Sequence, residues 1–150
     1  MIPGLEQAEF VRYGVMHRNT YLNAPTLLNK DFSVKGQETL YFAGQMTGVE
    51  GYVESAASGL MAGLSLAAKL LEEPVPDFPI ETAIGALGNY ISTAEPSNFQ
   101  PMNINFGIIA PLAERIRVKS DRYLAISMRS LKILERIKTQ SNLFHKGGQL

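Results

Sequence analysis

The segment 40–71 constrains the fold more than any other part of the sequence, because three patterns follow one another in it. Leu40-Tyr41-Phe42-Ala43 is a short apolar run, typical of a buried strand. Residues 44–51 contain three glycines in eight positions, and glycine permits positive φ and close approach to the backbone. A long helix is expected over 52–71. This order brings the amide groups of a helix N-terminus up to a polar or anionic ligand, so it predicts an α/β ligand-binding piece.

The expected helix carries Gly59 and Gly63 among many alanines. Each glycine costs a helix interior about 0.5–1 kcal/mol relative to alanine, so we expect another element to pack close to it. Two further short strands are expected between Phe10 and Leu22. A shorter helix is expected over 81–92, with Thr82 or the preceding Glu81 near its start. The Asn- and Pro-rich stretch 95–111 should be an irregular loop, a kind that is often functional.

The C-terminal part predicts a helix from about Arg122 to Thr139, capped by Ser120 or Asp121. Its apolar stripe would consist of Tyr123, Leu124, Met128, Leu131 and Leu134. The last ten residues should be frayed. We therefore divide the chain into residues 1–110 and a helical tail, 111–150.

Charge is distributed unevenly between these two parts. Residues 1–110 hold five Lys/Arg and eleven Asp/Glu, whereas residues 111–150 hold nine Lys/Arg and three acids, so that the whole chain is formally neutral. A basic tail helix would offer one face to a polyanion. A solvated helix face is an equally good interpretation of the charges alone.

Several classes of site and location are not expected. The chain has no cysteine, which excludes disulfides, thiolate metal sites and a cysteine nucleophile within it. His17 and His145 show no spacing typical of metal ligands, so no metal is expected. The N-terminus has no signal-peptide pattern. The uncharged run 55–68 has fourteen residues, fewer than the roughly 20 of a membrane-spanning helix, and we expect a cytoplasmic protein.

Four strings of the sequence resemble one protein family. They are Ile2-Pro3-Gly4-Leu5-Glu6, Arg12-Tyr13-Gly14 with His17-Arg18-Asn19-Thr20, the eighteen residues from Phe42 to Gly59, and Asn98-Phe99-Gln100-Pro101-Met102-Asn103 followed by Asn105-Phe106-Gly107. They resemble the C-terminal third of TrmFO, the folate- and FAD-dependent tRNA (uracil-5-)-methyltransferase family, which is related to the GidA/MnmG wobble-uridine enzymes. The string from Phe42 to Gly59 is the most specific part of a resemblance over about residues 2–130.

The resemblance implies a fold and a reaction. The fold is the C-terminal portion of an FAD fold of the type with two dinucleotide-binding motifs, followed by a helical tail. In that family, methylenetetrahydrofolate donates a one-carbon unit through reduced FAD to C5 of the T-loop uridine of tRNA, and NAD(P)H supplies reducing equivalents. Flavin and folate carry the chemistry, whereas the protein supplies position and electrostatics.

Two features of that family are missing from this sequence. The Gly-x-Gly-x-x-Gly motif that binds the ADP pyrophosphate is absent from this sequence. The sequence also has no cysteine for the chemistry that the family performs on uracil. The resemblance implies that both lie in a segment upstream of this one. We therefore expect the isolated chain to be unable to methylate tRNA.

The resemblance also assigns candidate site residues. The cofactor-binding set is the turn and helix start, Gly44, Gln45, Met46, Thr47, Gly48, Val49, Glu50, Gly51 and Tyr52. The polar cluster of His17, Arg18 and Asn19 is the candidate for the catalytic face, where Arg18 would hold a folate carboxylate or a phosphate. The candidate nucleic-acid-binding residues are Arg115, Arg117, Lys119 and Arg122.

Other side chains are expected to have structural roles. Glu50 and Glu54 stabilise the helix dipole, and the asparagines of the 95–111 loop, with Gln100, satisfy turn backbone.

Two alternative functions stay open: a GidA-like modification of the tRNA wobble uridine, and a non-catalytic RNA-binding fragment. The expected partners are tRNA and the remainder of the FAD fold. Exposed sheet edges would also offer a route to homodimers.

Overall fold

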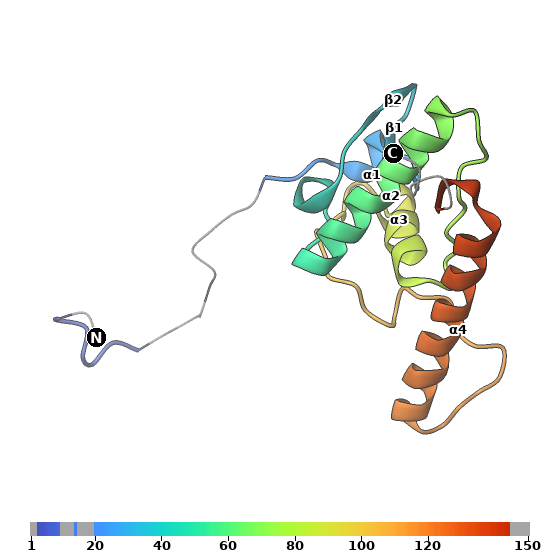
Figure 1. The fold of residues 1–150 in the computed structure, drawn as a ribbon. Helices are drawn as coiled ribbons and strands as arrows, with labels where there is room; N and C mark the ends of the chain where they lie inside the picture. Colours follow the sequence, from blue (N-terminus) through green and yellow to red (C-terminus); the bar gives the residue numbers. More distant parts are fainter. Residues whose placement is uncertain (1–2, 10–13, 15–19, 145–150) are drawn as a thin grey trace.

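The computed structural model describes residues 3–9, 14 and 20–144. It consists of a helical body from which a long C-terminal helix projects (Figure 1). The elements in chain order are α1 (Ala24–Leu27), β1 (Ser33–Val34), β2 (Gln37–Tyr41), the 3-10 helix η1 (Gly44–Thr47), α2 (Tyr52–Leu70), α3 (Ala83–Thr93), α4 (Lys119–Gln140) and the 3-10 helix η2 (Asn142–Phe144).

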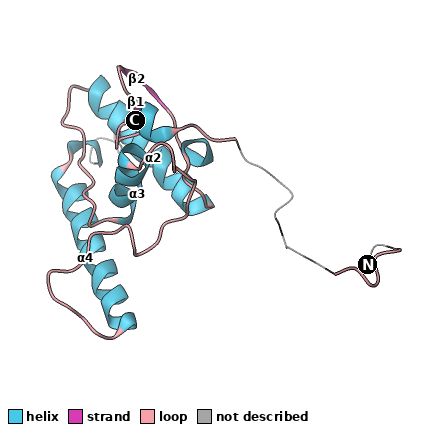
Figure 2. Cartoon of the chain, turned by 180° about the vertical axis from the view of Figure 1, so that it is seen from behind, coloured by secondary structure: helices cyan, strands magenta, loops and turns pink. Residues whose placement is uncertain are grey.

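Helices dominate the described part of the chain, whose sheet is a two-stranded hairpin of β1 and β2 (Figure 2). The α/β expectation is therefore confirmed in its coarse form, as a small mixed structure that is mostly helical. The strands expected between Phe10 and Leu22 lie largely outside the described residues, and residues 20–22 form neither helix nor strand.

The strand expected over 40–43 is displaced and is not buried. β2 begins at Gln37 and ends at Tyr41, and it pairs antiparallel with β1 in a register that places Ser33 opposite Tyr41. Leu40 is exposed. The prediction of a buried strand was wrong because burial needs neighbours on both edges and faces, whereas β2 pairs only with β1 within the described residues.

The long helix α2 confirms its predicted range to within one residue. Its buried positions are Ser58, Met61, Ala62, Ser65 and Ala68. On the exposed side, a Cβ added at Gly59 or Gly63 would meet nothing within 4 Å. The close neighbour that these glycines predict is therefore not found among the described residues.

The helix α3 packs against backbone rather than side chains at two glycines. Thr82 is its N-cap, as expected, and its Oγ1 accepts a hydrogen bond from the Gly85 N–H at 3.1 Å. A Cβ at Gly85 would overlap the Pro79 carbonyl and lie 2.7 Å from the Phe78 carbonyl carbon, and one at Gly88 would overlap the Lys30 carbonyl. Both positions therefore require glycine for packing.

The larger of two hydrophobic core clusters in the described residues joins α1, α2, α3 and the loops around them. Its largest fully buried apolar side chains are Leu28, Phe32, Val49 and Ile91, with Phe99 close to full burial. Val49 and Phe99 come from the glycine turn and the irregular loop 95–111, so these two segments belong to the core and are held by it.

The C-terminal helix α4 differs from its prediction at its start. It begins at Lys119, its N-cap is Val118, and no side chain caps it. Ser120 and Asp121 lie in the first turn, where the Ser120 hydroxyl donates to the Asp121 carboxylate at 3.1 Å. The predicted cap was wrong because these side chains bond to each other instead of to a backbone amide.

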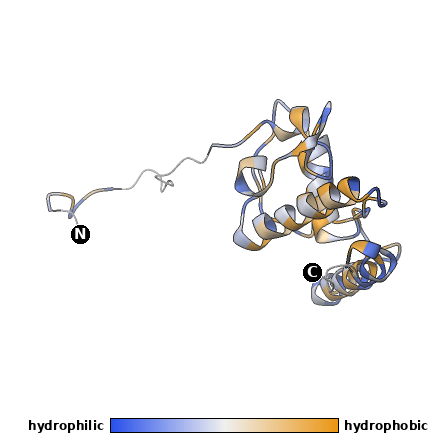
Figure 3. Ribbon diagram, turned by 45° about the horizontal axis from the view of Figure 1, so that its top comes forward, coloured by the Kyte–Doolittle hydropathy of each residue, from blue (hydrophilic) through white to orange (hydrophobic). Residues whose placement is uncertain are grey.

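The apolar stripe predicted for α4 was also largely wrong. Leu124, Met128 and Leu131 are 61, 63 and 66% exposed. The face that packs on the body instead carries Ile126 and Ser130, followed by Leu134 and Ile137 against the core. Hydrophobic and hydrophilic residues alternate along this helix (Figure 3). No helix in residues 3–9, 14 or 20–144 has both the length and the hydropathy of a membrane span.

Candidate functional site

The glycine turn between β2 and α2 is fastened to the side of α2. In η1, the Thr47 hydroxyl donates to the Gly44 carbonyl at 2.8 Å. The Gly44 N–H donates to Ser58 Oγ at 2.7 Å, and that hydroxyl donates in turn to the Ser55 carbonyl, also at 2.7 Å. Ser58 is buried within α2, so it holds the turn against the side of the helix, beyond the helix start. No pattern in the sequence marks Ser58 for this role.

The N-terminus of α2 is open. Gly51 is its N-cap and contributes no side-chain hydrogen bond. The N–H groups of Tyr52, Val53 and Glu54 have no acceptor among the described residues. The side chains of Tyr52 and Val53 are 98 and 80% exposed. Unpartnered amides at a helix start bind anionic or strongly polar oxygens, so this end of α2 can receive a polar oxygen of a ligand.

The three positions of the turn require glycine for different structural reasons. All adopt positive φ, with values of 73° at Gly44, 86° at Gly48 and 93° at Gly51. A Cβ at Gly48 would overlap the ring of Phe99, lying 2.9 Å from its Cε1 atom. A Cβ at Gly51 would overlap the Glu54 carboxylate and lie 2.8 Å from the Asn103 amide nitrogen. At Gly44, the nearest atom would be Ser55 Cβ at 3.8 Å. The protein's own packing therefore explains Gly48 and Gly51, and only Gly44 has free space where a side chain would be.

The irregular loop 95–111 is bonded directly to the glycine turn. Met102 N–H donates to the Gly48 carbonyl and Glu50 N–H donates to the Met102 carbonyl, both at 3.0 Å, which forms a parallel bridge between Val49 and Met102. The Ile104 N–H donates to the Glu54 carboxylate at 3.3 Å. Glu54 thus links the helix start to the loop, in addition to its expected place in the first turn of α2.

The expectation that the polar side chains of this loop satisfy turn backbone is confirmed at Asn105. The Asn105 side-chain oxygen accepts from the Gly107 N–H at 2.9 Å, which is a turn-forming bond. The Gln100 backbone carbonyl accepts from the Tyr90 hydroxyl at 2.7 Å.

The candidate catalytic residues His17, Arg18 and Asn19 lie outside the described residues. The chain that follows them does reach the turn, because Leu22 N–H donates to the Met46 carbonyl at 2.8 Å. Tyr21 meets Phe99 edge-on, with ring centroids 6.1 Å apart. Nearer the N-terminus, the Gly4 N–H donates to the Glu6 carboxylate at 3.0 Å, and this bond lowers the pKa of the exposed Glu6.

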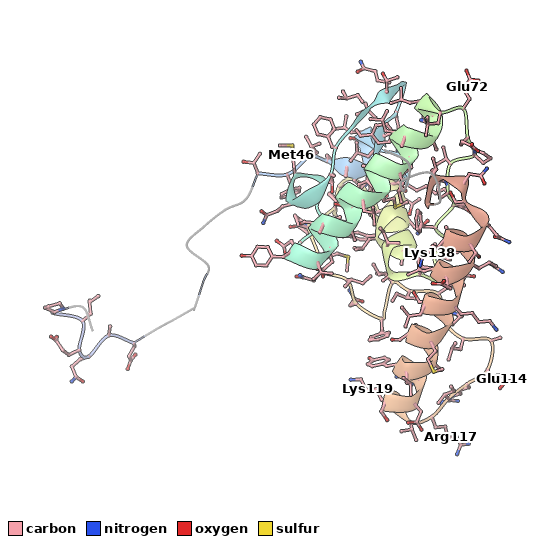
Figure 4. The ribbon with its side chains drawn as sticks, in the orientation of Figure 1. Met46, Glu72, Glu114, Arg117, Lys119 and Lys138 are labelled. Carbon is pink, nitrogen blue, oxygen red and sulfur yellow. The ribbon has the colours of Figure 1, made fainter. Side chains whose placement is uncertain are left out.

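The basic candidates occupy the free end of α4 and the loop before it. Arg115, Arg117 and Lys119 are exposed, whereas Arg122 is half-buried and donates to the Ile116 carbonyl at 3.4 Å. Figure 4 shows Arg117 and Lys119 at the end of α4 that lies farthest from the body. None of these four cations forms an ion pair within the described ranges.

One other arginine of α4 has a structural task. Arg129 donates to the Pro111 carbonyl at 2.8 Å and also to the Ala110 carbonyl. It therefore clamps the loop before α4 onto that helix, and the sequence offered no signal for this role. The glycine turn and the basic end remain separate surfaces, connected through the loop 95–118.

Comparison with known proteins identifies the relatives of this chain. A family model described as glucose inhibited division protein A matches residues 1–74. The methylenetetrahydrofolate–tRNA-(uracil-5-)-methyltransferase TrmFO of Pelotomaculum thermopropionicum is 56% identical over 140 residues, which is 92% of this chain and 32% of that protein. The TrmFO proteins of Staphylococcus epidermidis and Streptococcus uberis are 55 and 60% identical over 92 and 90% of the chain, and over 32 and 31% of their own lengths. The chain is therefore a homologue of the TrmFO family, and it spans about one third of the length of these curated relatives.

Proposed function

We propose that this chain is part of a flavoenzyme that methylates C5 of the T-loop uridine in tRNA with methylenetetrahydrofolate and reduced FAD. The observation that carries the proposal is the identity of 55–60% to three TrmFO methyltransferases over at least 90% of the chain. The proposed partners are tRNA and the remainder of the FAD fold, the proposed location is the cytoplasm, and NAD(P)H is the proposed source of reducing equivalents. The isolated chain is inactive in this proposal because it spans only a third of those enzymes.

Residues 1–110 form the cofactor part of the proposed enzyme, with Gly44–Tyr52 against the flavin. FAD supplies the redox and one-carbon transfer chemistry when it is bound. The chain itself contributes the amides of Tyr52, Val53 and Glu54, which would donate hydrogen bonds to flavin oxygens. The dipole of α2 favours negative charge at that place by up to about 2 kcal/mol in a partly buried setting. His17, Arg18 and Asn19 precede the segment bonded to Met46, which supports their proposed place beside the reacting face.

Residues 111–150 form the proposed tRNA-facing part. Arg115, Arg117, Lys119 and Arg122 would each neutralise a phosphate, since they have no acidic partner within the described residues. Affinity would then fall with salt, and the slope of log K against log salt would lose roughly 0.7–0.9 for each cation removed.

The flavin proposal is tested at Tyr52, the first residue of α2, where proline removes one N–H without breaking the helix. We place this chain in the Pelotomaculum thermopropionicum enzyme in exchange for the third that it matches. In that chimaera, Tyr52→Pro should lower the FAD content, because one donor at the helix start is lost. Tyr52→Ala is the matched control, since it removes the same side chain and keeps the N–H. Equal FAD content in the two variants would contradict the proposed contact.

The reaction is tested by the product. The chimaera should form C5-methyluridine in the T-loop of a tRNA transcript, and the 150-residue chain alone should form none. A modified wobble uridine instead would favour the GidA-like alternative. A folded, flavin-loaded chimaera without either product would leave the non-catalytic RNA-binding alternative.

A further inference from the structure

Two aromatic rings are stacked at the surface beside the basic residues. Phe106 of the irregular loop and Tyr123 of α4 have ring centroids 3.9 Å apart and ring planes only 5° from parallel. Phe106 is 36% exposed, and the bond from the Gly107 N–H to Asn105 fixes the turn that carries it. Each ring of a parallel pair has one face turned away from its partner. The pair is thus a preformed platform on which another flat group can stack.

Positive charge is concentrated at this platform. Lys119 Nζ and Arg122 Cζ each lie 5.5 Å from the centroid of the Tyr123 ring, within the range of a cation–π interaction. The Ile116 carbonyl accepts from Arg122, which orients that guanidinium. The neighbouring acids are Glu114 and Asp121, and both are exposed. The four cations of this end therefore outnumber its two acids.

A cavity of about 570 Å³ opens next to the stacked rings. Phe106, Ile109, Leu112 and Tyr123 contribute apolar walls, and Arg115 and Arg122 lie at its border. This volume is in the range of small-molecule sites, about 300–1,000 Å³. The exposed Glu114 also lines the cavity, so its two guanidinium groups leave a net positive charge. Apolar aromatic walls with this charge match a group that is both aromatic and anionic, which is the chemistry of a nucleotide.

We propose that this cavity receives an unpaired base of the tRNA, stacked on Phe106, while Arg115 and Arg122 hold its flanking phosphates. The inference rests on the proposed tRNA-binding function and specifies its contact. A base inside a duplex is stacked on both sides by its neighbours, so aromatic platforms on proteins take bases from loops, bulges and single strands. The platform therefore selects an unpaired segment, whereas Arg117 and Lys119 act on phosphates of either form.

The test uses the 150-residue chain and a short single-stranded RNA that contains the fluorescent base 2-aminopurine. Wild-type chain should bind this RNA and quench its fluorescence. Phe106→Leu, which keeps an apolar side chain but removes the ring, should weaken binding by roughly 10- to 100-fold and abolish the quenching. Its salt slope should stay unchanged, because no phosphate contact is lost. Phe106→Trp should restore both binding and quenching.

Two control variants distinguish the proposed base stacking from the tRNA-binding function on which it rests. Tyr21→Ala removes a ring with the same 36% exposure and should leave RNA binding unchanged. Arg115→Ala should reduce the salt slope and retain part of the quenching. If wild-type chain binds RNA but Phe106→Leu binds and quenches equally well, the base-stacking inference is overturned and the basic surface stands. If wild-type chain binds neither this RNA nor a tRNA transcript at low salt, the tRNA-facing surface and the stacking contact are both refuted.

Discussion

Replacing Gly48 by alanine separates two explanations for the glycine turn, its own packing and access for a ligand. Carbon atoms in contact lie about 3.5–4.0 Å apart, whereas the new Cβ would overlap the Phe99 ring and lie 2.9 Å from its Cε1 atom. Phe99 is 5% exposed and is packed by Tyr21 and Tyr90, at centroid distances of 6.1 and 5.6 Å. The ring cannot withdraw without disturbing both neighbours.

The expected cost has two parts. Inserting a methyl group into a packed site costs about 1–3 kcal/mol, and the positive φ of 86° costs an L-residue about 1–2 kcal/mol more. Gly48→Ala should therefore lower the free energy of unfolding of the chain by about 2–5 kcal/mol. That is a large share of the roughly 5–15 kcal/mol of a typical domain.

The assay is urea unfolding of the 150-residue chain, followed by circular dichroism. Gly44→Ala is the matched control, because it has a similar φ of 73° with no atom nearer than 3.8 Å; it should cost only about 1–2 kcal/mol. In a Phe99→Leu background, Gly48→Ala should likewise cost only about 1–2 kcal/mol, since the overlap is relieved. Equal costs for the two glycines, or strict additivity of Gly48→Ala with Phe99→Leu, would refute the packing explanation.

Three further predictions concern the elements that support the two surfaces. Gly85→Ala should destabilise the chain by about 1–3 kcal/mol because its Cβ meets rigid carbonyl groups. Gly59→Ala, in open space on α2, should stabilise it by about 0.5–1 kcal/mol. Thermal unfolding measures both changes, and a shift of the same sign in the two variants would contradict this difference in packing. Thr82→Val should cost about 1–2 kcal/mol through loss of the cap, measured by the same unfolding assay, and Thr82→Ser should restore most of it. Arg129→Ala removes the bonds to the Ala110 and Pro111 carbonyls, so it should lower the free energy of unfolding by about 1.5–3 kcal/mol. It should also weaken binding of single-stranded RNA, measured by fluorescence titration. An unchanged RNA affinity would show that these bonds do not order the basic loop.

The helices were predictable to the extent that local chemistry defines their ends. α2 and α3 begin at a glycine turn and at a threonine cap, and both were located within one or two residues. The start of α4 was missed because Val118 is its N-cap and no side chain marks it. Its apolar stripe was misassigned because Leu124, Met128 and Leu131 have helical spacing but remain mostly exposed in the structure.

The site was predictable only where it is continuous in sequence. The glycine turn was found from Gly44 to Tyr52, but the reason for Gly48 depends on Phe99, about fifty residues away, and Gly51 faces Asn103 as well as its near neighbour Glu54. The stacking of Phe106 on Tyr123 likewise joins two elements whose sequences show no mutual signal. Pairs of this kind arise from tertiary packing, which composition and spacing do not encode.

The five residues from Met102 to Phe106 connect the glycine turn to the stacked rings at the basic end of α4. The first residue is bonded on both sides to the glycine turn, Ile104 donates to Glu54 at the start of α2, and the last residue stacks on Tyr123. A ligand that shifts α2 or stiffens the glycine turn therefore also acts on the segment 102–106, which positions the ring of Phe106. Thermodynamic linkage makes such an effect mutual, so a cofactor that tightens RNA binding by some factor is itself held tighter by RNA by that same factor.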